Sequence, residues 1–432
     1  MMKYYSTNGK APLASLEKAV VKGLAEDRGL YMPEKIVSLP EEFFSNIQDM
    51  SFHDIAFTVA QAFFGEDVPT EDLRRIVCDT LSFDVPAVEV CENIWSLELF
   101  HGPTLAFKDV GARFMARMLQ HFLRSGNGEV NVLVATSGDT GSAVANGFLG
   151  VEGIKVYVLY PKGKVSPIQE CQFTTLGQNI TAVEVDGVFD DCQTLVKNAF
   201  MDNTLNSRMK LTSANSINVA RFLPQSFYYF YAYAQMKKKG LADNLVVCVP
   251  SGNFGNICSA LFGKRMGLPV RRFIAANNSN DIFYKYLQTG NYEPKASIQT
   301  IANAMDVGDP SNFARIYDLY GKSHDAIAAD ISGATYSDDR IADAMRECYA
   351  ANGYVCDPHG ACGYQALKEG LRPGETGIFL ETAHPAKFKS VVDGILGTDI
   401  EIPGKLQAFM KGTKKSVSLP NDYDAFRQLL QQ

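Results

Sequence analysis

From about residue 130 the chain alternates short apolar runs with helix-forming stretches, and this alternation limits the possible folds more than any other feature. The runs lie at 130–135, 154–160, 180–185, 245–249, 272–276 and 377–381. A strand that is apolar along its whole length is buried on both faces, which is typical of a parallel sheet covered by helices. In such folds ligands bind beyond the carboxyl ends of the strands. We therefore predict an α/β protein with its site in the loops that follow these strands.

The first hundred residues are different and have a mostly helical pattern. Ser15 is a candidate N-cap for a helix that continues through Leu24. A second helix is expected over 53–64, and a third begins near Thr70. Farther along, Asp190 is the candidate cap of the helix that follows the run at 180–185.

Composition excludes several classes of protein. Of 432 residues, 46% are hydrophobic and 21% are charged, which excludes disordered and fibrous chains. The 41 basic and 48 acidic residues give a net charge of −7, which argues against nucleic acid as the partner. There is no secretory signal and no apolar run of membrane-spanning length, so we expect a cytoplasmic protein that does not enter a membrane. The nine cysteines lack a CxxC pair and the six histidines lack metal-site spacing, so we expect reduced thiols and no metal.

PSGNFGN, at 250–256, lies between an apolar run and a predicted helix. Gly252 and Gly255 permit tight backbone geometry, and successive N–H groups at a helix start bind anions. The lysine of a P-loop and the GxGxxG dinucleotide spacing are both missing. The segment fits either a phosphate-binding loop or an ordinary strand-to-helix turn.

TSGDTGSA, at 136–143, occupies the same position after another run. Its hydroxyl and N–H groups could donate to a carboxylate, although Ser, Gly and Asp also favour ordinary turns.

FHGPTLAFKD, at 100–109, contains Lys108 directly before a helix with an apolar face formed by Val110, Phe114 and Met118. A lysine in apolar surroundings loses proton affinity and becomes a nucleophilic amine. The alternative is a surface lysine at a helix start.

GIFLETAHPAKF, at 377–388, places Thr382 directly after an apolar run, and His384 beside Pro385 favours a turn residue. Taken together, a lysine, a glycine loop, a hydroxyl at a strand end and a carboxylate-binding loop are the parts of a pyridoxal phosphate site.

The ordered motifs resemble the threonine synthase family, in its long form, over essentially the whole chain. The residues that carry the resemblance are HGPTLAFKD, TSGDTGSA, PKGKVSPIQECQ, SANSINVARFLPQ, PSGNFGNI, AMDVGDPSNFAR, DPHGACGY and ETAHPAKF. The resemblance implies a fold type II pyridoxal-phosphate enzyme with two parallel-sheet α/β domains. We place its additional, mostly helical N-terminal segment at 1–95. The catalytic region is then 96–432, made of two intertwined α/β domains with the site between them.

The resemblance also implies pyridoxal 5′-phosphate as the cofactor and assigns roles to residues. Lys108 is the Schiff-base lysine, and Thr382 faces the pyridine nitrogen. The cofactor phosphate is held by Gly252, Asn253, Phe254, Gly255 and Asn256. The substrate carboxylate meets the loop of Thr136, Ser137, Asp139 and Thr140, in which the part played by the acidic Asp139 stays open. Candidates for the substrate phosphate are Lys162, Lys164, Ser166, Asn215, Asn218, Arg221, Ser311, Asn312 and Arg315.

The implied reaction converts O-phospho-L-homoserine and water to L-threonine and phosphate, by γ-elimination and addition of water at the β-carbon. Such a lyase serves threonine biosynthesis, has a small-molecule substrate and is expected to be a monomer. The alternative within the family is a phospho-lyase that gives a 2-oxo acid, ammonia and phosphate. A cofactor-binding protein without catalysis is disfavoured because Lys108 and the glycine loop are both intact, and a nucleotide-binding protein because both nucleotide fingerprints are missing.

Overall fold

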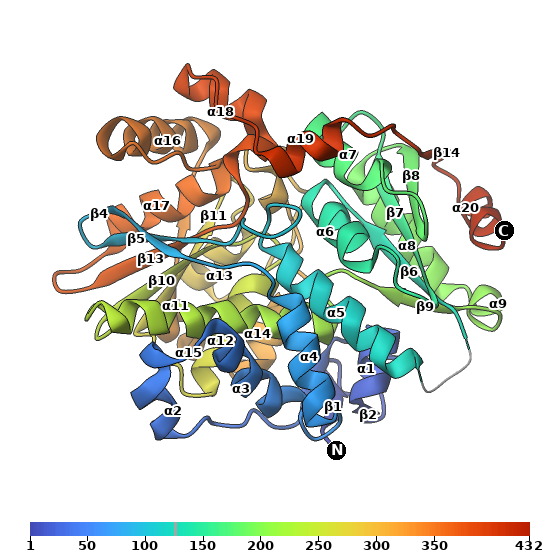
Figure 1. Cartoon of the computed structure of the whole chain (residues 1–432), viewed down its shortest axis with the longest axis horizontal. Helices are drawn as coiled ribbons and strands as arrows, with labels where there is room; N and C mark the ends of the chain where they lie inside the picture. The colour runs from blue at the N-terminus through green and yellow to red at the C-terminus, as the bar shows by residue number, and fades with distance from the viewer. Residues whose placement is uncertain (125–127) are drawn as a thin grey trace.

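Two mostly parallel sheets organise the computed structural model, which describes residues 1–124 and 128–432 (Figure 1). The larger sheet has the strand order β12-β11-β10-β13-β5-β4. All its neighbours are parallel except the edge pair β4–β5. Its strands are β4 (Ala87–Cys91), β5 (Ile94–Glu98), β10 (Leu245–Pro250), β11 (Arg272–Asn277), β12 (Ile331–Thr335) and β13 (Thr376–Glu381).

The smaller sheet is parallel throughout, with the order β14-β8-β7-β6-β9. Its strands are β6 (Val130–Ala135), β7 (Ile154–Pro161), β8 (Ile180–Asp186), β9 (Lys210–Ser213) and β14 (Val417–Pro420). Every residue of β6, β10 and β13 is buried, as continuous apolar runs require. The two sheets lie side by side in Figure 1, and each forms the centre of one lobe.

The predicted strands are confirmed at all six positions, with ends that differ by one residue at most. The remaining strands were not predicted. They include the small antiparallel sheet of β1 (Lys3–Ser6), β2 (Ala14–Ser15) and β3 (Tyr31–Pro33). Each of them has four residues or fewer, or is interrupted by polar residues or glycine, so no continuous apolar run marks it.

The predicted N-terminal helices are present as α1 (Leu16–Lys22), α3 (Phe52–Phe64) and α4 (Thr70–Thr80). Ser15 caps α1 by accepting the Lys18 N–H at 3.2 Å. The expected extension to Leu24 is wrong, because Gly23 ends the helix with a φ of 73°.

Asp190 is not the cap of α8 (Phe189–Met201), contrary to the prediction. The N-cap position is Val188, whose N–H donates to the Asp191 carboxylate at 2.8 Å. The helix therefore begins two residues earlier than a capping Asp190 would allow.

The boundary predicted at residue 95 falls inside β5, which lies between β13 and the edge strand β4 in the larger sheet. An apolar strand so placed belongs to the catalytic region. The structure therefore favours a boundary between the end of α4 and the start of β4.

Helices cover both sheets and join the N-terminal segment to them. Of these, α5 (Lys108–Leu123) contacts α4, α6 and α10, and α11 (Ser226–Lys238) contacts α3. The other helices are α2 (Glu41–Asn46), α6 (Asp139–Phe148), α7 (Pro167–Thr174), α9 (Asn203–Asn206), α10 (Val219–Phe222), α12 (Gly255–Arg265), α13 (Ile282–Thr289), α14 (Phe313–Leu319), α15 (His324–Asp330), α16 (Asp338–Asn352), α17 (Pro358–Gly370), α18 (Lys389–Leu396), α19 (Gly404–Met410) and α20 (Tyr423–Leu430).

Across residues 1–124 and 128–432, no helix combines the length and the hydropathy that a membrane crossing needs. All nine cysteines are free thiols.

Candidate active site

Lys108 is the first residue of α5 and lies next to the segment that leaves β13. The Phe107 N–H donates to the Thr382 carbonyl at 2.9 Å, and Ala106 forms a β-bridge with Ala383. These two contacts bring the predicted lysine and the predicted hydroxyl residue together, although they are 274 positions apart in the sequence. Thr382 itself is buried at the carboxyl end of β13.

The Lys108 amine is less basic than a free lysine. Burial is the main cause, and it lowers the pKa to about 8. The Asp139 carboxylate acts in the opposite direction, while the nearby cations Lys387 and Arg221 lower the pKa further. The surroundings of Lys108 are thus those that the nucleophile hypothesis required.

The loop between β10 and α12 forms a cradle of backbone donors. Within the described chain, the N–H groups of residues 252–256 have no protein acceptor. Phe254 turns the chain with a φ of 62°. A Cβ added at Gly252 would lie 2.7 Å from the Ala304 carbonyl oxygen, and one at Gly255 would lie 2.9 Å from the Ser216 Cβ. Free N–H groups at a helix start fit a phosphate, so this loop fits the cofactor phosphate that the sequence predicted.

The side chains of this loop hold it in place. Asn253 donates to the Ser216 hydroxyl at 2.7 Å and accepts the Ser311 N–H at 2.7 Å. Asn256 accepts hydroxyl hydrogen bonds from Tyr228 at 2.5 Å and Tyr229 at 2.6 Å. Both amides therefore fix the loop while its backbone stays free to bind.

The loop between β6 and α6 also presents free donors. Thr136 Oγ1 accepts the N–H groups of Gly138 at 2.9 Å and Gly141 at 2.8 Å, so its hydroxyl builds the turn. The N–H groups of Ser137, Asp139 and Thr140 have no acceptor among the residues placed by the structure. Three such donors suit a carboxylate.

Asp139 has a partner that the sequence did not reveal. Its Oδ1 lies 2.7 Å from Lys387 Nζ and accepts a hydrogen bond from Gln169 Nε2 at 2.9 Å. Burial alone would raise the pKa of this carboxyl, but the ammonium groups of Lys387 and Lys108 hold it well below its usual range. Lys387 lies in the quoted motif ETAHPAKF, yet only the tertiary structure brings it to Asp139.

Glu381, which precedes Thr382, was also missed. Its side chain is fully buried, and its Oε1 accepts the Asp357 N–H at 2.6 Å. Burial and the Asp357 charge raise the pKa of Glu381 well above its usual range, which favours the neutral acid.

Arg221 is the predicted phosphate ligand that the geometry favours most. Its side chain is buried, its Nη1 donates to the Lys108 carbonyl at 3.1 Å, and its Nε has no partner. In the described part of the chain no carboxylate lies within salt-bridge distance of it, and the Asp109 charge acts on it only from farther away. A buried guanidinium without an acidic partner favours an anionic ligand.

Three other candidates already use their polar groups. Arg315 is fully buried and donates to the carbonyls of Tyr31 and Ser216 and to the Asn312 side chain. Asn312 also donates to the Ser216 hydroxyl at 3.1 Å. Asn218 caps α10 and donates to the Val20 carbonyl at 2.9 Å. In this structure these residues hold the 215–218 segment and the loop beside it.

The remaining candidates lie at the edges of the site. Lys162 and Lys164 follow β7 and are exposed. Ser166 caps α7 and donates to Gln169 Oε1 at 3.0 Å. Asn215 reaches the Ala135 carbonyl at 3.4 Å. The Ser311 side chain is exposed, beside the phosphate cradle.

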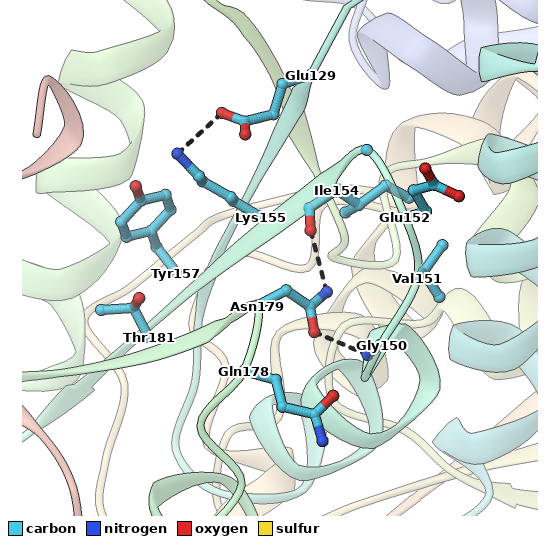
Figure 2. A pocket seen from close by; sticks show the side chains of 11 residues that line it. Glu129, Gly150, Val151, Glu152, Ile154, Lys155, Tyr157, Gln178, Asn179 and Thr181 are labelled. Carbon is cyan, nitrogen blue, oxygen red and sulfur yellow. Dashed lines mark hydrogen bonds and ion pairs between the residues drawn. The ribbon is translucent and has the colours of Figure 1, made fainter.

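A separate hollow, drawn in Figure 2, lies at the amino ends of β6, β7 and β8, opposite the ends that carry these loops. Asn179 accepts the Gly150 N–H at 2.8 Å and donates to the Ile154 carbonyl at 3.0 Å, and Lys155 pairs with Glu129 at 3.1 Å. Its main polar groups satisfy one another, so it is a weak candidate. No cluster of three or more His, Cys, Asp or Glu suited to a metal exists in the described ranges.

Family models match three overlapping parts of the chain. They are the threonine synthase N terminus over residues 3–81, a pyridoxal-phosphate dependent enzyme over 80–381, and the threonine synthase C-terminal model over 360–430.

Similar proteins and solved structures agree with these models. The chain is 44% identical to a threonine synthase of Escherichia coli and 43% identical to one of Haemophilus influenzae, with 99% of each chain covered. A crystal structure of the Escherichia coli threonine synthase matches with a TM-score of 0.94 over 100% of this chain and 99% of that one. A threonine synthase from Brucella melitensis with bound PLP matches with a TM-score of 0.93 at 34% identity, over 100% of this chain and 99% of that one. The chain therefore belongs to the threonine synthase family of pyridoxal-phosphate-dependent enzymes.

Proposed function

We propose that this protein converts O-phospho-L-homoserine and water to L-threonine and phosphate, with Lys108 as its central catalytic residue. The observation that best supports this proposal is the position of Lys108. It lies near Arg221 and near Asp139 of the 136–141 loop. The substrate has an amine, a carboxylate and a phosphate, and the site offers a cofactor-bearing lysine, a donor loop and a buried guanidinium.

Pyridoxal phosphate, when bound, withdraws electrons from the substrate amine and so acidifies the neighbouring C–H bonds. The N–H groups of residues 252–256 would hold its phosphate, and the Thr382 hydroxyl would face its ring nitrogen. A hydroxyl does not keep that nitrogen protonated as a carboxylate would. Glu381, which precedes Thr382 in the sequence, is favoured as a neutral acid. The choice of reaction then depends on where the protein places its proton-transfer groups.

Lys108 is the group that moves protons. An amine with a pKa of about 8 is partly neutral near physiological pH, so it can accept a proton from the α-carbon. Once it has given that proton up, the neutral amine can accept a second one from the β-carbon. As an ammonium it returns a proton to the γ-carbon after phosphate has left.

Two sets of donors orient the substrate. The N–H groups of Ser137, Asp139 and Thr140 bind its carboxylate, and Arg221 binds its phosphate. Ser166, Asn215, Ser311 and Lys162 lie at the edges and supply further donors when the lobes close. Asn218, Asn312 and Arg315 position these segments. Location in the cytoplasm and a monomeric state stay predictions from the sequence.

The deciding experiment is product analysis. Cofactor-loaded protein is mixed with O-phospho-L-homoserine, and phosphate, threonine and 2-oxobutyrate are measured together. We expect threonine and phosphate in equal amounts. Phosphate with 2-oxobutyrate in place of threonine would show that the protein catalyses the phospho-lyase reaction. If no phosphate is released, O-phospho-L-homoserine is not the substrate.

A further inference from the structure

A fully buried lysine lies near Lys108 and has no part in the function proposed above. Lys387 belongs to the short 3-10 helix η4 (Pro385–Phe388), and its side chain has no exposed surface. Its Nζ lies 2.7 Å from Asp139 Oδ1 and donates to the Thr104 carbonyl at 2.8 Å. The Asp139 side chain is only 4% exposed, so this ion pair is inside the protein.

The pair joins the two lobes. Asp139 is the first residue of α6, which packs on the smaller sheet, whereas Lys387 follows β13 of the larger sheet. Gln169 of α7 donates to the same Oδ1 at 2.9 Å, and the Ser166 hydroxyl lies 3.3 Å from the Lys387 carbonyl. The link therefore includes side chains and backbone from both lobes.

The location of Asp139 creates an electrostatic difficulty. It lies in the same loop whose free N–H groups suit a carboxylate ligand. A buried carboxylate without a counter-charge would repel such a ligand and would itself be costly to bury. The Lys387 ammonium removes both difficulties, because it cancels the charge of the loop where the ligand binds.

We propose that Lys387 is a positioning residue for this reaction: its ion pair with Asp139 cancels the charge of the 136–141 loop and fixes that loop against the opposite lobe, so that the substrate carboxylate binds beside Lys108. The inference rests on the proposed function, because it presumes a substrate with a carboxylate at this loop. Lys387 acts through Asp139 and is assigned no contact with the reacting atoms.

The pair also contributes two opposing charges to the surroundings of Lys108. The charged groups that act on the Lys108 amine are Asp139 from α6, Lys387 from η4 and Arg221 from α10. Removal of Lys387 or Asp139 alone changes the local charge by one unit, and removal of both leaves it unchanged. Single and double variants therefore separate a charge effect from a packing effect.

The test compares Lys387→Met, Asp139→Asn and the double variant, with Lys387→Arg as the control that keeps the charge. We expect Lys387→Met to raise KM for O-phospho-L-homoserine about 100-fold, with a smaller loss of kcat, because it strands a buried carboxylate. The KM of the double variant should be about 10-fold lower than that of Lys387→Met, because neither charge remains. Lys387→Arg should stay closer to the wild-type KM than Lys387→Met does.

A second readout needs neither substrate nor cofactor. In the cofactor-free protein, the rate at which an amine-reactive acylating reagent modifies Lys108 is followed against pH by peptide mass spectrometry. The midpoint should move up in Lys387→Met, down in Asp139→Asn, and return near the wild-type value in the double variant. If wild-type protein makes no threonine, the proposed function fails, while this readout still decides whether the pair sets the charge around Lys108.

Three results would overturn the inference. The first is that Lys387→Met leaves both the KM and the pH midpoint of Lys108 acylation unchanged. The second is that the free-energy loss in the double variant, calculated from KM, equals the sum of the losses in the two single variants. The third is a loss of kcat alone that the double variant does not restore, since Lys387 would then act on the reacting atoms. If Lys387→Met does not fold, a folded double variant supports charge cancellation, and an unfolded one contradicts it.

Discussion

The two loops of the site both present free backbone N–H groups to an anion, but they differ in charge. Each follows a buried parallel strand, begins a helix and leaves backbone N–H groups free. The 252–256 loop contains no charged residue and is held by amide side chains such as Asn253. The 136–141 loop carries a buried carboxylate that is balanced by Lys387 from the other lobe. An uncharged loop needs no partner to receive a phosphate, whereas the second loop depends on the approach of the two lobes.

The largest effect is expected at Lys108. Lys108→Ala should lower kcat by about 10²- to 10⁴-fold and remove the visible absorption band of the bound cofactor, because both proton transfer and the covalent link are lost. The protein should stay folded, since Lys108 is not part of the apolar core. Steady-state kinetics, absorption and thermal unfolding measure these three properties. Full activity in Lys108→Ala would contradict the assignment of Lys108 as the catalytic residue.

Gly252→Ala tests the uncharged loop. The added Cβ meets backbone atoms, the Ala304 carbonyl oxygen at 2.7 Å and Met305 Cα at 2.8 Å, and these cannot move aside cheaply. At about 1–3 kcal/mol for overpacking, affinity for pyridoxal phosphate should fall about 10- to 100-fold, with KM for the substrate less affected. Fluorescence titration of cofactor-free protein measures the change.

Gly404→Ala is the matched control for this change, because an added Cβ there meets nothing within 4 Å. An equal loss of cofactor affinity in both variants would contradict the assignment of the 252–256 loop.

The low proton affinity of Lys108 predicts how the stability of the cofactor-free protein changes with pH. Its folded pKa of about 8 lies below the ordinary value of 10.5, so between these pH values the unfolded chain binds more protons than the folded one. The free energy of unfolding should therefore rise with pH across this window, by about 2 kcal/mol at most after allowance for partial exposure. Urea unfolding of wild type and Lys108→Met isolates the contribution, because the variant has no titrating group there. Parallel pH profiles for the two proteins would show that Lys108 is not perturbed.

Gly138→Ala tests the charged loop and should have the smallest effect. Gly138 has a φ of 145°, and the added Cβ would lie 2.6–2.7 Å from the flexible Gln169 side chain that donates to Asp139. At about 1–2 kcal/mol of backbone strain, we expect KM for the substrate to rise about 10-fold while cofactor affinity stays near wild type.

Gly240→Ala introduces a smaller positive-φ strain, at 73°, with nothing within 4 Å of the added Cβ. A parallel rise of KM in this control, or a loss of cofactor affinity in Gly138→Ala, would contradict the assignment of the 136–141 loop to the substrate and of the 252–256 loop to the cofactor.

The sequence alone determined the parts of this protein that depend on local pattern. Continuous apolar runs identified the six strands and the parallel arrangement, because burial on both faces requires such runs. Glycines after those strands identified both donor loops, because positive φ and close approach exclude side chains. The family prediction is confirmed by the models and relatives that match the whole chain. The individual site residues stay predictions, supported by where the structure places them.

Only the tertiary structure decided which charges meet. Asp139 and Lys387 are 248 positions apart, and nothing in the local sequence of either shows that they pair. The same holds for Arg221, which is buried without a salt bridge to a carboxylate, and for Arg315, whose donors are already engaged by carbonyls. Their sequence context makes both equally attractive as phosphate ligands. The physical reason is that strand and turn patterns are local, whereas the electrostatics of a buried site depend on distances that the packing of two lobes sets.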